Sequence, residues 1–376
     1  MRPIQMVDLR EEYLRIKPEV DAAVMNVLDN SAYINGPQVQ RFADALSRHH
    51  NVNHVITCAN GTDALQIAMM ALGLERGDEV ITPSFTYIAT TEVIALLGLT
   101  PVFVDVDENT FCIDVAALQK AITPKTKAIV PVHLFGHAAN MEAIMQIAEA
   151  HNLFVIEDNA QAIGCDFFYS NGGVKKTGAI GTVSTTSFYP SKNLGCYGDG
   201  GAMATNDDAL AVKLKMIGNH GQSKRYYHDI VGCNSRLDTV QAAILEIKLK
   251  RLDSYITARI KVADYYDAAF AKSLKISTPF RAAYSRHVFH QYTLVLDGVD
   301  RNGLQEYLAE AGIPSMIYYP VAAHKQKMFS SFHSESIHLP VTDRLTERVI
   351  SLPIHTEMAA DQLEYITTRV LSYVNK

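Results

Sequence analysis

The stretch SFYPSKNLGCYGDGGA, residues 187–202, holds a single lysine, Lys192, among small, aromatic and turn-forming residues. Most lysines are solvated surface residues, and Lys192 alone would be read that way. Its neighbours favour a chemical role for the amine instead. Ser187 ends an apolar run, Pro190 stiffens the backbone that leads to Lys192, and the glycines allow close backbone contact. A desolvated lysine loses its proton more readily and can attack a carbonyl carbon to form a Schiff base.

Schiff-base lysines are typical of pyridoxal phosphate sites, where the ring nitrogen must stay protonated and therefore needs a carboxylate partner. Asp158 ends the apolar run FVIED and is the candidate for that partner, although a helix N-cap would look the same. In ANGTDALQ, Gly61 and Thr62 start a predicted helix, where unpaired N–H groups favour a phosphate. Many strand-to-helix turns share that feature.

Two further groups would complete such a site. Ser187 can add a hydroxyl to the phosphate-binding groups, and the FTY segment offers Tyr87 or Phe85 as an aromatic over the ring. Aromatic residues at such positions more often pack in the core. No single one of these residues identifies the site, but their occurrence together in this order favours a pyridoxal phosphate site.

The elements that must position these groups follow a regular alternation. From about residue 54, short apolar runs such as EVITPS, PVFVDVD and KAIVPVHL alternate with helical patterns such as TTEVIALLG, DVAALQKAI and NMEAIMQIAEAH. This alternation predicts βαβ units and a mainly parallel sheet flanked by helices, an α/β fold. Since parallel sheets bind ligands beyond the carboxyl ends of their strands, segments 60–62, 85–87, 157–161 and 187–192 are expected to meet there.

The chain changes character in its last third. A long helical region from about residue 238 to 270 leads into new strands in STPFRAAYSRHVFHQYTLVLDG and a helix in NGLQEYLAEAGIP. We therefore predict a large cofactor-binding domain over residues 1–250 and a smaller C-terminal α+β domain over residues 251–376. The extreme N-terminus is a candidate to pack on the smaller domain.

Composition narrows the class of protein. The 376 residues carry a net charge of −6, and this balance argues against a nucleic-acid or membrane-surface binder, because phosphates and anionic lipids demand a basic face. The five cysteines are scattered without a CxxC pair, so neither a disulfide framework nor a zinc site is indicated. With no signal-type or membrane-length apolar run, we expect a soluble cytoplasmic protein.

The chain resembles the DegT/DnrJ/EryC1 group of pyridoxal-phosphate-dependent sugar aminotransferases over nearly its full length. The similar segments are YINGPQV at 33–39, CANGTDALQIA at 58–68, GDEVITPSFTYIATTE at 77–92, PVFVDVD at 101–107, TPKTKAIVPVHLFG at 123–136, VIEDNAQAIG at 155–164, SFYPSKNLGCYGDGGA at 187–202, NHGQSKRYYHDIVGCNSRLDTVQAAIL at 219–245 and YYPVAAHKQ at 318–326. The SFYPSKNLG and NSRLD blocks are highly specific.

The resemblance implies a fold-type I aminotransferase and gives each matching residue an expected role. Lys192 would hold the cofactor through a Schiff base and move the proton, with Asp158 as the ring-nitrogen partner and Gln161 near the ring hydroxyl. Tyr87 falls on the stacking position. The phosphate-binding positions are matched by Gly61, Thr62, Ser187 and Asn234. Asn234 would come from the neighbouring subunit, so the active site would need a homodimer.

The resemblance also implies a substrate class, a nucleotide-linked keto sugar with glutamate as amino donor. The pattern from residue 220 to 245 looks closest to aminotransferases acting on UDP-2-acetamido-2-deoxy-3-keto-glucuronic acid in surface polysaccharide synthesis. Expected substrate residues are His220, Arg225, Arg236, Tyr318, Tyr319 and His324. Without the resemblance, the basic run would be a solvated face, the tyrosines interface packing and His324 an ordinary exposed histidine.

Other readings stay open at this point. Within the family, dTDP-3-keto-6-deoxyhexose 3-aminotransferases and 4-keto sugar aminotransferases share nearly every cofactor residue. From another class, a non-catalytic sugar-nucleotide sensor would keep the fold, but it has no need for Lys192, Asp158 and Gln161. A Rossmann dehydrogenase lacks support, because NGTDA is not GxGxxG. Asn159 departs from the commoner alanine of the EDxAQ block, with no predicted effect.

Overall fold

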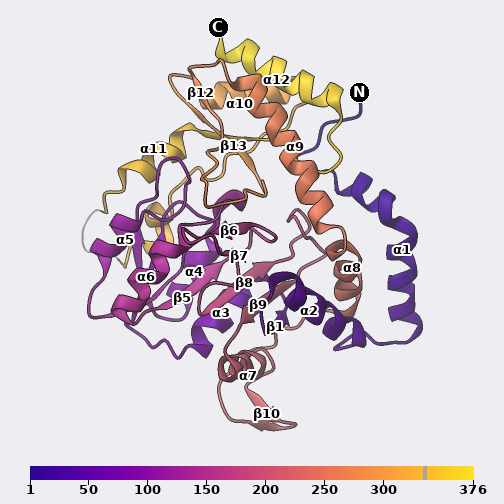
Figure 1. The fold of residues 1–376 in the computed structure, drawn as a ribbon, viewed down its shortest axis with the longest axis vertical. Coiled ribbons are helices and arrows are strands. Elements are labelled where there is room, and N and C mark those ends of the chain that lie inside the picture. The colour runs from indigo at the N-terminus through magenta and orange to yellow at the C-terminus, as the bar shows by residue number, and fades with distance from the viewer. Residues whose placement is uncertain (333–336) are drawn as a thin grey trace.

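A seven-stranded sheet forms the centre of the larger part of the molecule (Figure 1). The computed structural model describes residues 1–332 and 337–376. The strands lie in the order β1-β9-β8-β5-β4-β2-β3. Their bounds are β1 (His54–Cys58), β2 (Glu79–Pro83), β3 (Thr100–Val104), β4 (Thr126–Ile129), β5 (Phe154–Asp158), β8 (Val183–Ser187) and β9 (Gly201–Thr205).

Pairing in this sheet is mostly parallel. Strands β3, β2, β4, β5 and β8 pair in parallel, whereas β9 runs antiparallel to both β8 and β1. The predicted α/β fold is therefore confirmed. The antiparallel step from β8 to β9 was not expected, and it makes the chain turn back directly after the Lys192 loop.

Helices cover both faces of the sheet because alternate strand residues point to opposite sides. On one face, Val80 and Ile156 pack in a core with α3 (Gly61–Ala71), α4 (Ala89–Leu96) and α7 (Asp208–Ile217). On the other, Ile81 and Val155 pack in a core with α2 (Pro37–His50), α5 (Val115–Ala121), α6 (Met141–His151) and α8 (Thr239–Leu249). Both faces are buried, as expected for strands that read as continuous apolar runs.

A second, smaller core contains residues from the C-terminal third of the chain. It surrounds the antiparallel sheet β12 (Ile276–Ser277), β13 (Tyr292–Leu296) and β14 (Val349–Leu352), with α9 (Leu252–Phe270), α10 (Arg301–Glu310) and α12 (Ala360–Val374). The helix α11 (Pro340–Arg348) precedes β14. Ile4, at the extreme N-terminus, lies in this core. The boundary between residues 250 and 251 stays a prediction, although α8 and α9 are separated there.

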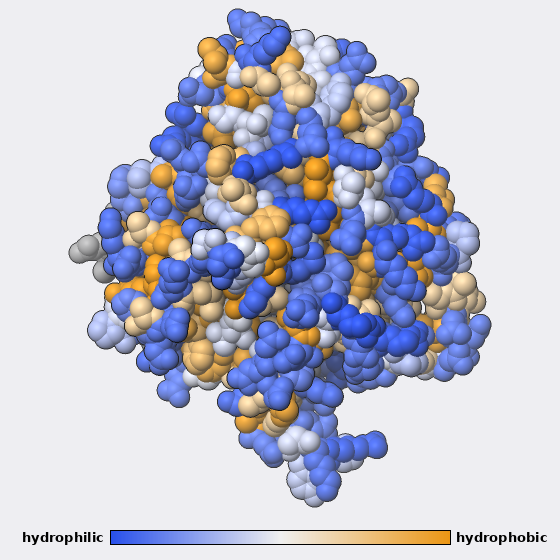
Figure 2. All heavy atoms as spheres, in the orientation of Figure 1, coloured by the Kyte–Doolittle hydropathy of each residue, from blue (hydrophilic) through white to orange (hydrophobic). Residues whose placement is uncertain are grey.

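Helix α1 (Leu9–Asp29) and two hairpins lie outside the two larger sheets. Helix α1 lies on the outside of the molecule against α8. One hairpin consists of β6 (Asp166–Phe168) and β7 (Val174–Lys176), and another of β10 (Gln222–Lys224) and β11 (Tyr227–His228). The β10–β11 hairpin projects beyond α7 and stands clear of the main body (Figures 1 and 2). Within the described residues, no helix is both long and apolar enough to cross a membrane.

Candidate active site

Most of the predicted cofactor residues line one cavity of about 620 Å³. This volume is typical of small-molecule sites. Among the residues that line the cavity are Gly61, Thr62, Tyr87, Asp158, Gln161, Ser187, Lys192, Tyr318 and Tyr319. They follow or end the strands β1, β2, β5 and β8, apart from the 318–319 segment. Parallel strands deliver their carboxyl ends to one edge of the sheet, which explains why residues far apart in sequence meet here.

Lys192 lies partly buried in the loop after β8. Burial lowers the pKa of its amine to about 8, against the opposing charge of Asp158. The loop is fixed on both sides, because Lys192 N donates to Tyr189 O at 2.8 Å and Asn193 Nδ2 donates to Val288 O at 3.0 Å. A Cβ at Gly195 would lie 2.3 Å from Pro190 O, so this tight turn requires glycine. The amine is therefore held in place and readily deprotonated, as a nucleophile requires.

Asp158 ends β5 and is 5% exposed. Its carboxylate accepts a hydrogen bond from Thr90 Oγ1 at 2.7 Å and one from Ala160 N at 3.1 Å. Its own N–H donates to Pro131 O at 2.9 Å. A buried carboxylate with fixed orientation at the cavity wall can hold a protonated ring nitrogen.

The phosphate-binding candidates meet where α3 begins. Asn60 caps the helix, accepting from Asp63 N at 2.8 Å. A Cβ on Gly61 would lie 2.8 Å from Ser187 Cβ, so glycine lets β8 approach the first helical turn. The first N–H groups of a helix have no partner within it and attract anions. The Ser187 side chain therefore lies beside a helix terminus that is suited to attract an anion.

The aromatic wall of the cavity is formed by Tyr87 and Tyr319, whose ring centroids lie 6.2 Å apart. Tyr87 is 56% exposed, whereas Phe85 is fully buried, so of the two aromatics considered from sequence only Tyr87 lines the cavity. Gln161 is held at both ends. Its Nε2 donates to Tyr319 Oη at 3.0 Å, and its Oε1 accepts from Phe135 N at 2.7 Å.

Four predicted residues lie away from this cavity in the single chain. His220, Arg225 and Asn234 are exposed near or on the projecting β10–β11 hairpin, and Arg236 lines a separate cavity of about 400 Å³ beside β1. The same chain does not bring them to Lys192. Their roles toward cofactor and substrate stay predictions that require a second subunit.

His324 is also outside the residues that line the main cavity. Its side chain is 4% exposed, its Nδ1 lies 2.8 Å from Ser84 Oγ, and its Nε2 lies 3.7 Å from Asp343 Oδ1. The ring thus connects Ser84, after the end of β2, to Asp343 on α11. Its role toward the substrate stays a prediction.

Sequence reasoning missed several residues at the site. Thr90 orients Asp158, and His290 and Gln291 line the cavity beside Lys192. The position of Thr90 just after FTY was a usable signal. No local signal marks His290, because only tertiary folding brings it to the cavity. Asn159 is fully buried and does not line the cavity; its Nδ2 donates to Thr177 O at 3.3 Å.

A parallel sheet whose strand ends present a buried amine, a fixed carboxylate and an anion-binding turn defines an enzyme of the fold-type I aminotransferase class. The chain belongs to the DegT/DnrJ/EryC1/StrS aminotransferase family, whose model matches residues 14–371. The resemblance inferred from the sequence motifs is confirmed.

Three curated relatives cover nearly the whole chain. A Pseudomonas aeruginosa UDP-2-acetamido-2-deoxy-3-oxo-D-glucuronate aminotransferase is 46% identical over 96% of this chain and 98% of its own. A Geobacillus stearothermophilus pleiotropic regulatory protein is 43% identical over 98% of each. An Acidithiobacillus ferrooxidans UDP-N-acetyl-3-dehydro-alpha-D-glucosamine 3-aminotransferase is 43% identical over 97% of this chain and 96% of its own.

Solved structures agree with this fold. The S. venezuelae DesV structure in complex with a ketimine intermediate superposes with a TM-score of 0.95, at 37% identity and full coverage of both chains. The Bacillus subtilis ntda structure with bound cofactor pmp gives a TM-score of 0.88 at 31% identity, covering 96% of this chain and 82% of that one.

Proposed function

We propose that this aminotransferase moves an amino group from glutamate to C3 of UDP-2-acetamido-2-deoxy-3-keto-glucuronic acid, in the synthesis of surface polysaccharide sugars. The observation that carries the proposal is the meeting of Lys192, Asp158 and the α3 terminus in one cavity. The 46% identity to a UDP-3-oxo-glucuronate aminotransferase supports the choice of sugar. A dTDP-3-keto-6-deoxyhexose or a 4-keto sugar is the competing substrate.

Pyridoxal phosphate is the cofactor that these residues fit. When bound, it supplies an electron sink for the carbon that loses its proton. Lys192 Nζ would act as the acid and base that moves this proton, which its lowered pKa permits. Asp158 would keep the ring nitrogen protonated, Gly61, Thr62 and Ser187 would bind the phosphate, and Tyr87 would cover the ring.

A second subunit is part of the proposal. Asn234 would bind the phosphate of the neighbouring site, and His220, Arg225 and Arg236 would contact the sugar nucleotide there. The exposure of His220, Arg225 and Asn234 supports this arrangement, as does the absence of all four residues from the lining of their own cavity. Basic side chains suit the diphosphate and the uronic carboxylate of the substrate. Tyr318, Tyr319 and His324 would complete the pocket from the first subunit. A cytoplasmic location likewise stays a prediction.

The test combines spectroscopy with product analysis. Purified holoenzyme is mixed with glutamate, and the visible absorbance of the cofactor should be lost in the wild type but not in Lys192→Ala. Lys213→Ala changes an exposed lysine and serves as the matched control. Failure of the wild type to respond to any amino donor would favour a sensor. With a panel of UDP- and dTDP-keto sugars, a product aminated at C4 would contradict the proposed substrate.

A further inference from the structure

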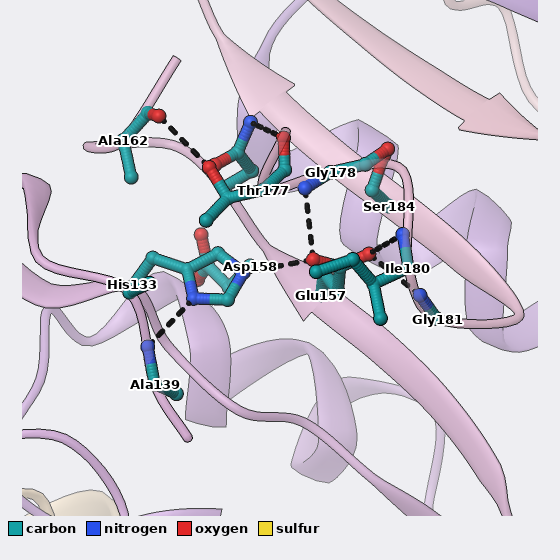
Figure 3. A network of polar contacts seen from close by, with 12 residues as sticks. His133, Ala139, Glu157, Asp158, Ala162, Thr177, Gly178, Ile180, Gly181 and Ser184 are labelled. Atoms are coloured by element: carbon teal, nitrogen blue, oxygen red, sulfur yellow. Dashed lines mark hydrogen bonds and ion pairs between the residues drawn. The ribbon is translucent and has the colours of Figure 1, made fainter. Parts of the chain in front are cut away.

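A buried polar network lies directly behind the cavity, centred on Glu157, the residue that precedes Asp158 on β5. Both Glu157 and His133 are fully buried, and neither lines the cavity. Successive strand residues point to opposite faces, so Glu157 points away from the cofactor cavity while Asp158 lines it. Figure 3 shows the Glu157 carboxylate between the His133 ring and the loop that carries Gly178, Ile180 and Gly181.

The hydrogen bonds assign the protons of this pair. His133 Nδ1 accepts from Ala139 N at 3.1 Å, so the ring proton must lie on Nε2. That Nε2–H donates to Glu157 Oε2 at 2.9 Å. The imidazole is therefore neutral, and its contact with Glu157 is a hydrogen bond and not an ion pair.

Glu157 is nevertheless ionised. Besides His133, its carboxylate accepts the amides of Gly178 at 2.8 Å, Ile180 at 2.7 Å and Gly181 at 2.7 Å. Each carboxylate oxygen accepts two N–H donors, Oε1 from Ile180 and Gly181 and Oε2 from His133 and Gly178, which leaves neither oxygen a free position for a proton. Burial raises the pKa of the carboxyl, but it is held below its ordinary value of 4.5, with the hydrogen bond from His133 as the largest lowering cause. These four partners lie within the described residues, and their N–H groups stabilise the buried charge.

The surrounding titratable groups do not cancel this charge. His50 on α2 and Tyr169 beyond β6 feel the field of Glu157. Burial lowers the pKa of His50 to about 3 and raises the pKa of Tyr169, so both are neutral at neutral pH. Lys192 lies on the other side of β5, in the cavity with Asp158.

The network is also joined to the backbone of Asp158. The His133 N–H donates to Asp158 O at 3.1 Å, while the ring of the same residue binds Glu157. Val132, between Pro131 and His133, lines the cavity. The side chain of Glu157 thus connects the 178–181 loop to the 131–133 segment. The backbone of that segment forms hydrogen bonds with the backbone of Asp158 and holds it in position.

We propose that Glu157 is a positioning residue of the aminotransferase site, which with neutral His133 fixes Asp158 and places a second buried negative charge behind it. This inference rests on the proposed function, because the group that Glu157 would affect is the protonated ring nitrogen of the cofactor, held by Asp158. Buried charges interact strongly across a weakly screening interior, so the second carboxylate increases the proton affinity of that nitrogen.

The test uses holoenzyme reconstituted with pyridoxal phosphate carrying ¹⁵N in the ring. The nitrogen chemical shift is followed against pH in wild type, Glu157→Gln and His133→Gln. Glu157→Gln removes the charge at nearly constant volume and should lower the pKa of the ring nitrogen by about 1, with kcat falling about tenfold. His133→Gln keeps an N–H donor for Glu157, so the ring nitrogen in this variant should have the same pKa as in the wild type.

Asp158→Asn separates the two hypotheses. If it leaves the ring nitrogen protonated, the proposed function of Asp158 fails. If the ring nitrogen loses its proton in Asp158→Asn but keeps the wild-type pKa in Glu157→Gln, only the role of Glu157 is overturned.

A measurement on the wild type covers the case in which Glu157→Gln does not fold. The ¹³C shift of the Glu157 carboxyl should report an ionised group at pH 7. A protonated Glu157 at that pH would overturn the inference.

Discussion

At the scale of single residues, the site depends on the protonation of Lys192. Its amine shares a cavity with the carboxylate of Asp158, whose charge raises the pKa of the amine and so favours the ammonium form. Desolvation is the larger effect and lowers the pKa to about 8. The cofactor-free enzyme therefore holds an amine that is poised between the ammonium and the nucleophile near physiological pH.

A pH prediction follows from this value. In cofactor-free enzyme, the rate of acylation of Lys192 by an amine reagent should rise with pH and reach its midpoint near 8, because only the neutral amine reacts. Mass spectrometry of the peptide that contains Lys192 measures the rate, and exposed lysines in the same sample serve as the comparison. A midpoint that coincides with theirs would contradict the desolvated environment. Asp158→Asn should lower the midpoint further, since the carboxylate opposes the shift.

At the scale of elements, the predicted phosphate-binding region depends on the close approach of β8 to α3. The strand β8 ends at Ser187 and the helix begins at Gly61, and a side chain at position 61 would overlap Ser187. The adjacent strand β9 packs equally closely, because a Cβ on Gly201 would lie 2.4 Å from the carbonyl carbon of Asn60. Glycines at these contacts bring the helix terminus and the serine hydroxyl to one point.

Gly61→Ala should therefore weaken cofactor binding. The added methyl group must push β8 and α3 apart, at a cost of about 1–3 kcal/mol, so the cofactor dissociation constant should rise about tenfold or more. Titration of cofactor-free protein by fluorescence measures it. Gly173→Ala is the control, since its Cβ would meet the exposed Asn171 side chain at 3.1 Å and would lie at ordinary contact distance, 3.7 Å, from Tyr169. Unchanged affinity in Gly61→Ala would argue against a phosphate at this turn.

At the scale of the whole molecule, one chain supplies only part of the predicted site. The β10–β11 hairpin carries exposed Tyr226 and Tyr227 beside Lys224 and Arg225, away from the main body. Exposed aromatic and basic side chains on a projecting arm are suited to contact another surface. The proposed homodimer gives this arm a neighbouring cavity to complete.

Subunit complementation tests that arrangement. Lys192→Ala and Asn234→Ala are coexpressed with different tags, and mixed dimers are isolated. If Asn234 serves the partner's site, one of the two sites is intact, and activity should recover to about half of the wild type. Pairing Lys192→Ala with Asp158→Asn damages both sites and should give no recovery. Absence of recovery in the first mixture as well would mean that Asn234 acts in the site of its own chain.

The sequence alone predicted Lys192, Asp158, Gly61 and Ser187 as one set, which the structure places in one cavity, and it predicted the α/β fold that holds them. Both conclusions depend on local information: apolar periodicity along each strand and residue types at the strand ends. The specific SFYPSKNLG and NSRLD blocks indicated the family to which the chain belongs.

The tertiary structure decided which groups contact these residues. It selected Tyr87 over Phe85 by burial, brought Thr90 and His290 to the cavity, and placed Glu157 behind it. The physical reason is that hydrogen-bond partners and solvent exclusion arise from packing between distant segments. A glutamate in a strand looks the same in sequence whether water or four buried donors surround it, and only the fold distinguishes the two.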